Sequence, residues 1–144
     1  MEMKVSDLLD RWTILRMKAR YDDSAKKELI VFDQEVQKLF KADLENYRPG
    51  EMPRTFTSTF LNALLSLQEA NAKTWENESA IRNEYAKDPA NTVKNFKSEQ
   101  EYLIEVGRKA LAIRDYNKIR ISAKNLIDKL FGQIPDVKVN HASQ

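Results

Sequence analysis

Residues 113–128, IRDYNKIRISAKNLID, set polar side chains among the apolar positions of a predicted long helix. At 100° per residue, the apolar residues of this stretch form one broad arc, and Asn117, Arg120 and Lys124 fall inside it. Arg114 lies at the edge of the arc. Removing an isolated charge or amide from water is costly, so these side chains should pair with other groups or line a cavity.

Two other predicted helices carry polar side chains of the same kind. In the helix predicted for residues 57–86, Glu78 lies close to the centre of the apolar stripe. In the first helix of the chain, two basic side chains flank the stripe on one side. The full set on these two helices is Arg11, Lys18, Asn71, Trp75, Glu78 and Arg82.

These polar side chains have two interpretations. In the first, they form a closed network: Glu78 accepts from an arginine, and the asparagines set the register between long helices, as buried polar residues do in coiled coils. In the second, the cations outnumber Glu78, and the surplus receives an anionic ligand such as a phosphate. Trp75 or Tyr116 would then stack on a base or sugar, although Trp12 and Trp75 taken singly are typical of a core.

The composition is that of a charge-rich globular chain. Of its 144 residues, 42% are apolar and 32% charged, which is too apolar for disorder and enough for one domain. The net charge is +2 with both signs mixed along the chain, which argues against a dedicated nucleic-acid-binding protein. The chain has no cysteine, and neither a membrane span nor a signal peptide is visible. We therefore expect a cytoplasmic protein without disulfides or a membrane partner.

Start and stop signals predict where the first two helices lie. Ser6 is the expected N-cap of a first helix that ends near Tyr21. Asp22 or Ser24 is expected to begin a second helix that ends near Leu44.

The second half of the chain is predicted to hold two longer helices. Prolines and a glycine indicate a loop over residues 46–54, before the helix predicted for residues 57–86. A break is predicted at residues 87–91, and Ser98 followed by Glu101 matches a capping box at the start of the last helix.

The last helix is predicted to end at Gly132, a residue suited to a helix C-terminus. Residues 1–132 would then form a single helical domain, and residues 133–144 a C-terminal tail or arm. Two helices of about thirty residues are long for a chain of this size, which favours a homo-oligomer.

The sequence lacks the residues on which several enzyme classes depend. His141 is the only histidine and the glycines are scattered, so neither a histidine-based site nor a P-loop is predicted within the fold. A magnesium-dependent helical hydrolase needs clustered carboxylates. The closest approximations, Asp7 with Asp10 and Glu101 with Glu105, lie away from the stripe centres and are predicted to be solvated. We expect no metal site and no cofactor.

Three stretches together resemble a known group of proteins: SDLLDRWTILRMK, LSLQEANAKTWENESAIR and ALAIRDYNKIRISAKNLID. They are similar to small uncharacterised all-helical proteins of bacteria and phages, which are domains of unknown function often encoded near glycosyltransferase genes. The resemblance covers about a third of the chain and implies an α-helical fold with a shared polar set, but no activity. Its matching positions are Asp10, Arg11, Thr13, Lys18, Asn71, Trp75, Glu78, Arg82, Asn117, Arg120 and Lys124.

The sequence thus predicts an all-α bundle of four main helices, with two long antiparallel helices through which the chain self-associates. The favoured function is non-enzymatic binding of a phosphorylated or nucleotide-like small molecule, for sensing, delivery or sequestration. A phage sponge for a signalling nucleotide is one such protein. The alternatives are a structural or adaptor module and a magnesium-dependent nucleotide hydrolase. The predicted ligand-binding residues are Arg11, Lys18, Asn71, Trp75, Glu78, Arg82, Arg114, Asn117, Arg120 and Lys124.

Overall fold

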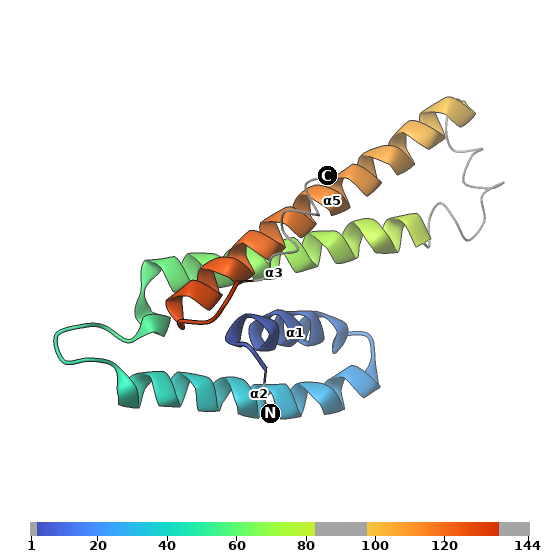
Figure 1. Cartoon of the computed structure of the whole chain (residues 1–144). Helices are drawn as coiled ribbons and strands as arrows, with labels where there is room; N and C mark the ends of the chain where they lie inside the picture. The colour runs from blue at the N-terminus through green and yellow to red at the C-terminus, as the bar shows by residue number, and fades with distance from the viewer. Residues whose placement is uncertain (1–2, 83–97, 136–144) are drawn as a thin grey trace.

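The computed structural model describes residues 3–82 and 98–135, which form four α-helices, one 3-10 turn and no strand (Figure 1). The prediction of an all-α fold is therefore confirmed, while the predicted break at residues 87–91 lies outside the described residues. None of the described helices combines the length and apolar character needed to cross a membrane. The elements are α1 (Val5–Lys18), α2 (Asp23–Asn46), η1 (Arg54–Phe56), α3 (Ser58–Ala80) and α5 (Glu99–Leu130).

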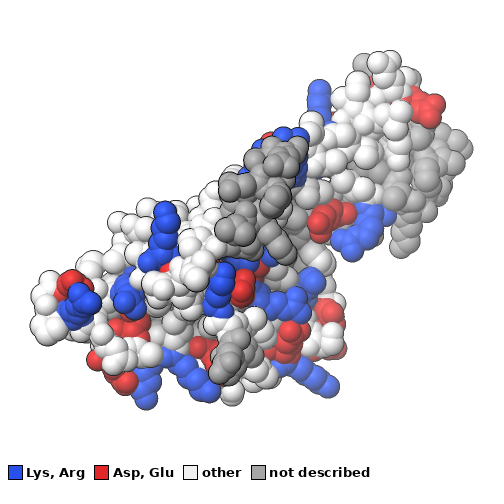
Figure 2. Space-filling view, viewed as in Figure 1, with Lys and Arg blue, Asp and Glu red and all other residues white. Residues whose placement is uncertain are grey.

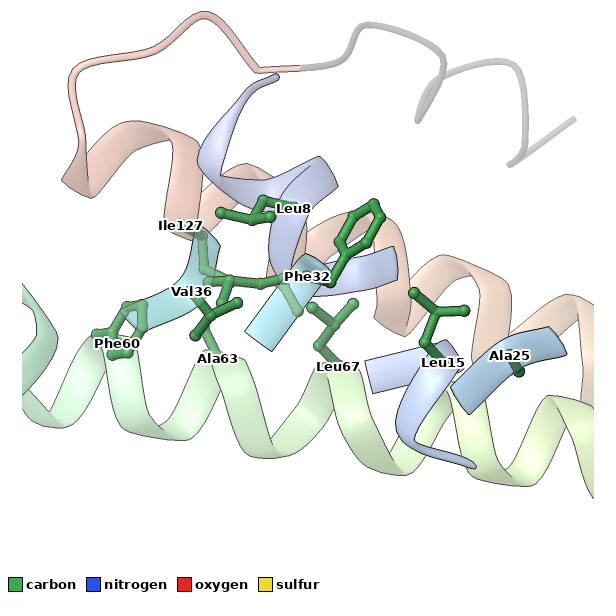
Figure 3. Packing of buried hydrophobic residues seen from close by; sticks show 11 residues of the cluster. Leu8, Leu15, Ala25, Phe32, Val36, Phe60, Ala63, Leu67 and Ile127 are labelled. Carbon is green, nitrogen blue, oxygen red and sulfur yellow. The ribbon is translucent and has the colours of Figure 1, made fainter. Parts of the chain in front are cut away.

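Helix α1 packs between α2 on one side and the pair of α3 and α5 on the other. In Figure 1, α3 and α5 lie side by side, α2 lies on the far side of α1, and the start of α5 reaches beyond α1 and α2. The core contains the nearly inaccessible side chains of Leu9 and Leu15 from α1, Phe60 and Leu67 from α3, and Ile127 from α5. Figure 3 shows this cluster, to which α2 adds further apolar side chains. Burial of side chains of this size stabilises a fold by about 1.5–3 kcal/mol each.

Three of the helices begin at a side-chain cap. The Asp22 carboxylate accepts from the backbone N–H of Ser24 at 2.9 Å, as predicted for the start of α2. Thr57 accepts from the N–H of Phe60 at the start of α3, and Ser98 accepts from the N–H of Glu101 at the start of α5. These hydrogen bonds satisfy N–H groups that the helix itself leaves without acceptors.

The start of α1 differs from the prediction. The helix begins at Val5, so Ser6 is not its N-cap but a buried residue inside the first turn, 1% exposed. The acceptor comes instead from the other end of the chain, because the side-chain Oε1 of Gln133 accepts from the N–H of Val5 at 2.8 Å. The Lys4 ammonium also donates to the carbonyl of Ile134 at 2.7 Å. The turn after α5 therefore holds the start of α1.

The turn that supplies these contacts depends on Gly132. Its φ of +67° lies in the left-handed region, which glycine adopts without steric strain. The next residue, Gln133, donates its N–H to the carbonyl of Asp128 at 2.7 Å, closing a helix C-cap of the predicted kind. This reversal turns the side chain of Gln133 toward α1.

Replacing Gln133 by alanine removes the only side-chain acceptor seen at the start of α1 among the described residues. We expect the free energy of unfolding to fall by about 1 kcal/mol, the typical value of a lost N-cap. Urea titration followed by circular dichroism measures it. Gln37→Ala, at an exposed position of α2, is the matched control and should change stability by less than about 0.5 kcal/mol. Equal effects of the two substitutions would contradict the capping role.

Candidate functional site

Asp10 of α1 is the centre of a polar cluster that also includes Thr13, Asn71 and Arg120. Its carboxylate is 6% exposed and accepts two hydrogen bonds from the Arg120 guanidinium, with 2.9 Å between Nε and Oδ1. The Asn71 side-chain amide donates to Asp10 Oδ1 and to Thr13 Oγ1, both at 2.9 Å. One carboxylate thus joins α1, α3 and α5 through groups that satisfy one another.

The balance of forces on Asp10 favours its charged form. Burial disfavours the carboxylate and would raise its pKa, but hydrogen bonds from Arg120 and Asn71 and the charges of Arg120 and Lys124 outweigh it, so the pKa of Asp10 lies below its ordinary value. The hydrogen bond to Asp10 outweighs desolvation of the guanidinium and raises the pKa of Arg120. The two side chains therefore form an ion pair at neutral pH.

This finding corrects the expectation that Asp7 and Asp10 form a solvated face. Asp10 is buried, and the half-buried Asp7 pairs with Lys124 at 2.8 Å. The spacing i, i+4, i+7 of Ser6, Asp10 and Thr13 puts three side chains of α1, each at most 6% exposed, on one line. That spacing is the sequence signal for this second buried face of α1, but polar residue types concealed it.

An open cleft of about 270 Å³ lies beside this pair, where the C-terminal half of α1 faces α3 and α5. We call it the Trp75 cleft. It brings together most of the residues that the sequence analysis selected, which lie far apart along the chain. Its lining residues are Ile14, Met17, Lys18, Asn71, Thr74, Trp75, Glu78, Arg82, Asn117 and Arg120.

Three of the selected cations lie elsewhere. Arg11 forms an ion pair with Glu28 of α2 at 3.1 Å, and Lys124 pairs with Asp7. Arg114 is exposed and does not line the Trp75 cleft. The predicted arrangement in which Glu78 faces all the cations is therefore not formed, because Glu28 of α2 pairs with Arg11 and the α1 aspartates pair with Lys124 and Arg120.

Most of the charged side chains that line the Trp75 cleft are not in ion pairs with other described residues. The Lys18 ammonium lies 5.8 Å from the centre of the Trp75 ring, and in residues 3–82 and 98–135 Lys18, Glu78 and Arg82 form no ion pair. Arg120 also lines the cleft, and its Nη1 donates to Asn117 Oδ1 at 3.4 Å. Three cations and one carboxylate, that of Glu78, line the cleft.

The face of the molecule drawn in Figure 2 carries charges of both signs. Figure 2 shows lysine and arginine interspersed with aspartate and glutamate on the visible face. Within the described ranges, no three histidine, cysteine, aspartate or glutamate side chains come together as metal ligands would. Comparisons with protein-family models, curated proteins and solved structures found no match to this chain.

Asp10→Asn leaves the Arg120 guanidinium, which is about one-third exposed, without its counter-charge. We expect a loss of about 2–4 kcal/mol of unfolding free energy at pH 7, since removing one partner of a buried pair leaves the other uncompensated. Urea unfolding monitored by circular dichroism provides the measurement. Asp23→Asn, which removes only an exposed pair with Lys26, should cost at most about 1 kcal/mol.

The same pair gives a pH dependence of known sign. Because the pKa of Asp10 is lower in the folded chain than its ordinary value of 3.8, its contribution is fully present above about pH 4 and is lost as the pH falls through the lowered pKa. The stability difference between wild type and Asp10→Asn should therefore shrink in acid. A difference that stays constant from pH 7 to about pH 2 would contradict the assignment.

Proposed function

We propose that the protein binds a phosphorylated or nucleotide-like small molecule in the Trp75 cleft and performs no chemistry on it. The observation that carries the proposal is the surplus of cationic over anionic lining residues around a half-buried indole. A phosphate placed between Lys18, Arg82 and Arg120 would receive charge-assisted hydrogen bonds, which are stronger than neutral ones. The sugar or base would lie against Trp75.

The Asp10 pair makes Arg120 a suitable phosphate ligand. Asp10 accepts from Nε and Nη2, so the guanidinium plane is held in one orientation with Nη1 directed toward Asn117 at the cleft. A fixed fork loses little side-chain freedom when it binds an anion. Asp10 therefore acts as a positioning residue for Arg120 in this proposal.

The size and chemistry of the cleft limit the ligand. A volume of about 270 Å³ lies just below the usual lower bound of roughly 300 Å³ for small-molecule sites, so a single nucleotide or a sugar phosphate fits better than a larger molecule. A magnesium-dependent hydrolase would need several carboxylates to hold the metal. Glu78 is the only carboxylate among the lining residues, so no observation favours that alternative.

A second candidate is a structural or adaptor module, and one observation favours it. The Asp10 network already neutralises Arg120 and crosses three helices, as buried polar groups do when they set helix register.

We infer further that α3 and α5 run antiparallel. Supporting this, Phe60 near the start of α3 stacks edge-on with Phe131 just after α5, with 6.1 Å between ring centres.

Thermal denaturation separates the two candidates. The probes are adenosine monophosphate, guanosine monophosphate, ribose 5-phosphate and inorganic phosphate, each with and without Mg²⁺. For the binding function, at least one organic phosphate should raise the Tm by several degrees, since a ligand at 100 times its Kd adds about 2.7 kcal/mol. Phosphate release that depends on Mg²⁺ would contradict the statement that no chemistry occurs.

Matched arginine variants locate the site. Arg82→Gln should weaken binding of the active probe at least about tenfold, whereas Arg114→Gln should leave it unchanged because Arg114 is outside the cleft. In a Trp12→Phe background, Trp75 is the only tryptophan, so its fluorescence reports stacking directly. If no probe changes the Tm or the Trp75 emission, the ligand proposal is wrong and the structural role remains. Equal effects of the two arginine substitutions would place binding elsewhere.

A further inference from the structure

The outward face of α5 carries a regular line of exposed apolar side chains. Ile104, Leu111, Ile119 and Leu126 are 49%, 58%, 46% and 46% exposed. On a helix of 100° per residue they fall within an arc of about 80°, and the buried Ala123 and Ile127 follow at the edge of this arc that faces α3. We call these four residues the α5 outer stripe. Arg108, Asp115 and Ser122 lie in the same arc between them. Exposed apolar side chains gathered on one face of a charge-rich helix mark an interaction surface.

The α5 outer stripe is symmetric about Asp115. Ile104 precedes Asp115 by the same number of positions as Leu126 follows it, and Leu111 and Ile119 are likewise equidistant from it. An antiparallel pair of α5 helices related by a twofold axis at Asp115 therefore places Ile104 against the partner's Leu126. It also places Leu111 against the partner's Ile119. Self-complementarity of this kind is what a twofold interface requires.

The second half of the α5 outer stripe borders a groove between α3 and α5. The groove has a volume of about 470 Å³, and its lining includes Ile119 and Leu126 together with the small side chains of Ala63, Ser66 and Ser122. Small residues allow another helix to approach closely. The first half of α5 extends beyond α1 and α2, which leaves it free of that layer (Figure 1). The exposed start of one α5 thus has a shape that suits the groove of a second copy.

The charges at the ends of α5 select the antiparallel orientation. The first turn is acidic, with Glu99 and Glu101, and the last turn carries Lys129. Glu101 and Lys129 are equidistant from Asp115, so antiparallel pairing brings opposite charges together at both ends, whereas parallel pairing would bring like charges together. At the axis Asp115 faces its own copy, and Lys118 of each chain lies one turn away to offset that repulsion.

We propose that two copies of the chain associate through antiparallel α5 helices, with the start of each α5 lying in the α3–α5 groove of the other. The interface uses the face of α5 opposite Asn117 and Arg120, and it shares no lining residue with the Trp75 cleft. Its test is therefore independent of any ligand.

Sedimentation equilibrium tests the dimer. The wild type should have about twice the 16.8 kDa mass of one chain. Leu111→Glu places a charge against the partner's Ile119, one turn from Asp115, and should raise the dimer Kd by at least about 100-fold, leaving the helical circular dichroism of the chain unchanged. Leu44→Glu, on an α2 leucine exposed to a similar 46%, is the matched control and should remain dimeric. A wild type that is monomeric at about 100 μM, well above typical dimer Kd values, would overturn the proposal.

Cysteine cross-linking tests the orientation, because the chain has no cysteine of its own. Ile104→Cys and Leu126→Cys are prepared separately, mixed and oxidised. The antiparallel dimer should give a disulfide only between the two different variants, and Asp115→Cys alone should link to itself across the axis. Self-linking of Ile104→Cys would indicate parallel pairing and overturn the proposal. A dimer in which neither the mixture nor Asp115→Cys cross-links would place the interface elsewhere and overturn it as well.

Discussion

The ion pair between Asp10 and Arg120 determines how α1 lies against α3 and α5. A buried carboxylate is tolerated only where donors replace the water that it has lost, and here Arg120 and Asn71 supply them. These donors come from two different helices, so α1 has one register against α3 and α5 in which Asp10 is satisfied. Sliding α1 by one helical turn would leave both the Asp10 carboxylate and the Arg120 guanidinium without a partner. The resulting loss of stability would be larger than if only apolar side chains met at this interface.

The same pair connects the core to the Trp75 cleft. Arg120 donates to Asp10 with two of its nitrogen atoms and to Asn117, another lining residue of the cleft, with the third, so its charge is partly neutralised and its orientation is set. Lys18 and Arg82 differ from it, since neither forms an ion pair in the described part of the chain. The polar cluster is therefore a closed network at its centre and an open cationic cleft at its edge. The closed-network interpretation describes the centre of the cluster, and the cleft at its edge is where we propose that an anion binds.

The helices and their caps were largely predictable because they depend on local signals. Asp22, Ser98 and Gly132 act through residues only two to five positions away, and the structure places all three as expected. Ser6 was assigned wrongly because the group that caps α1 is Gln133, at the opposite end of the chain. A cap that comes from a residue so distant in sequence leaves no local pattern.

The sequence by itself determined which helices form and which polar side chains stand inside apolar faces, since both follow from a periodicity of 3.6 residues. It did not determine which charges meet. Asp10 looked solvated because a helical wheel shows one buried face, and α1 has two, one against α2 and one against α3 and α5. Only the tertiary structure decided that Asp10 rather than Glu78 neutralises Arg120, because ion pairing depends on distances between helices that the order of residues does not encode.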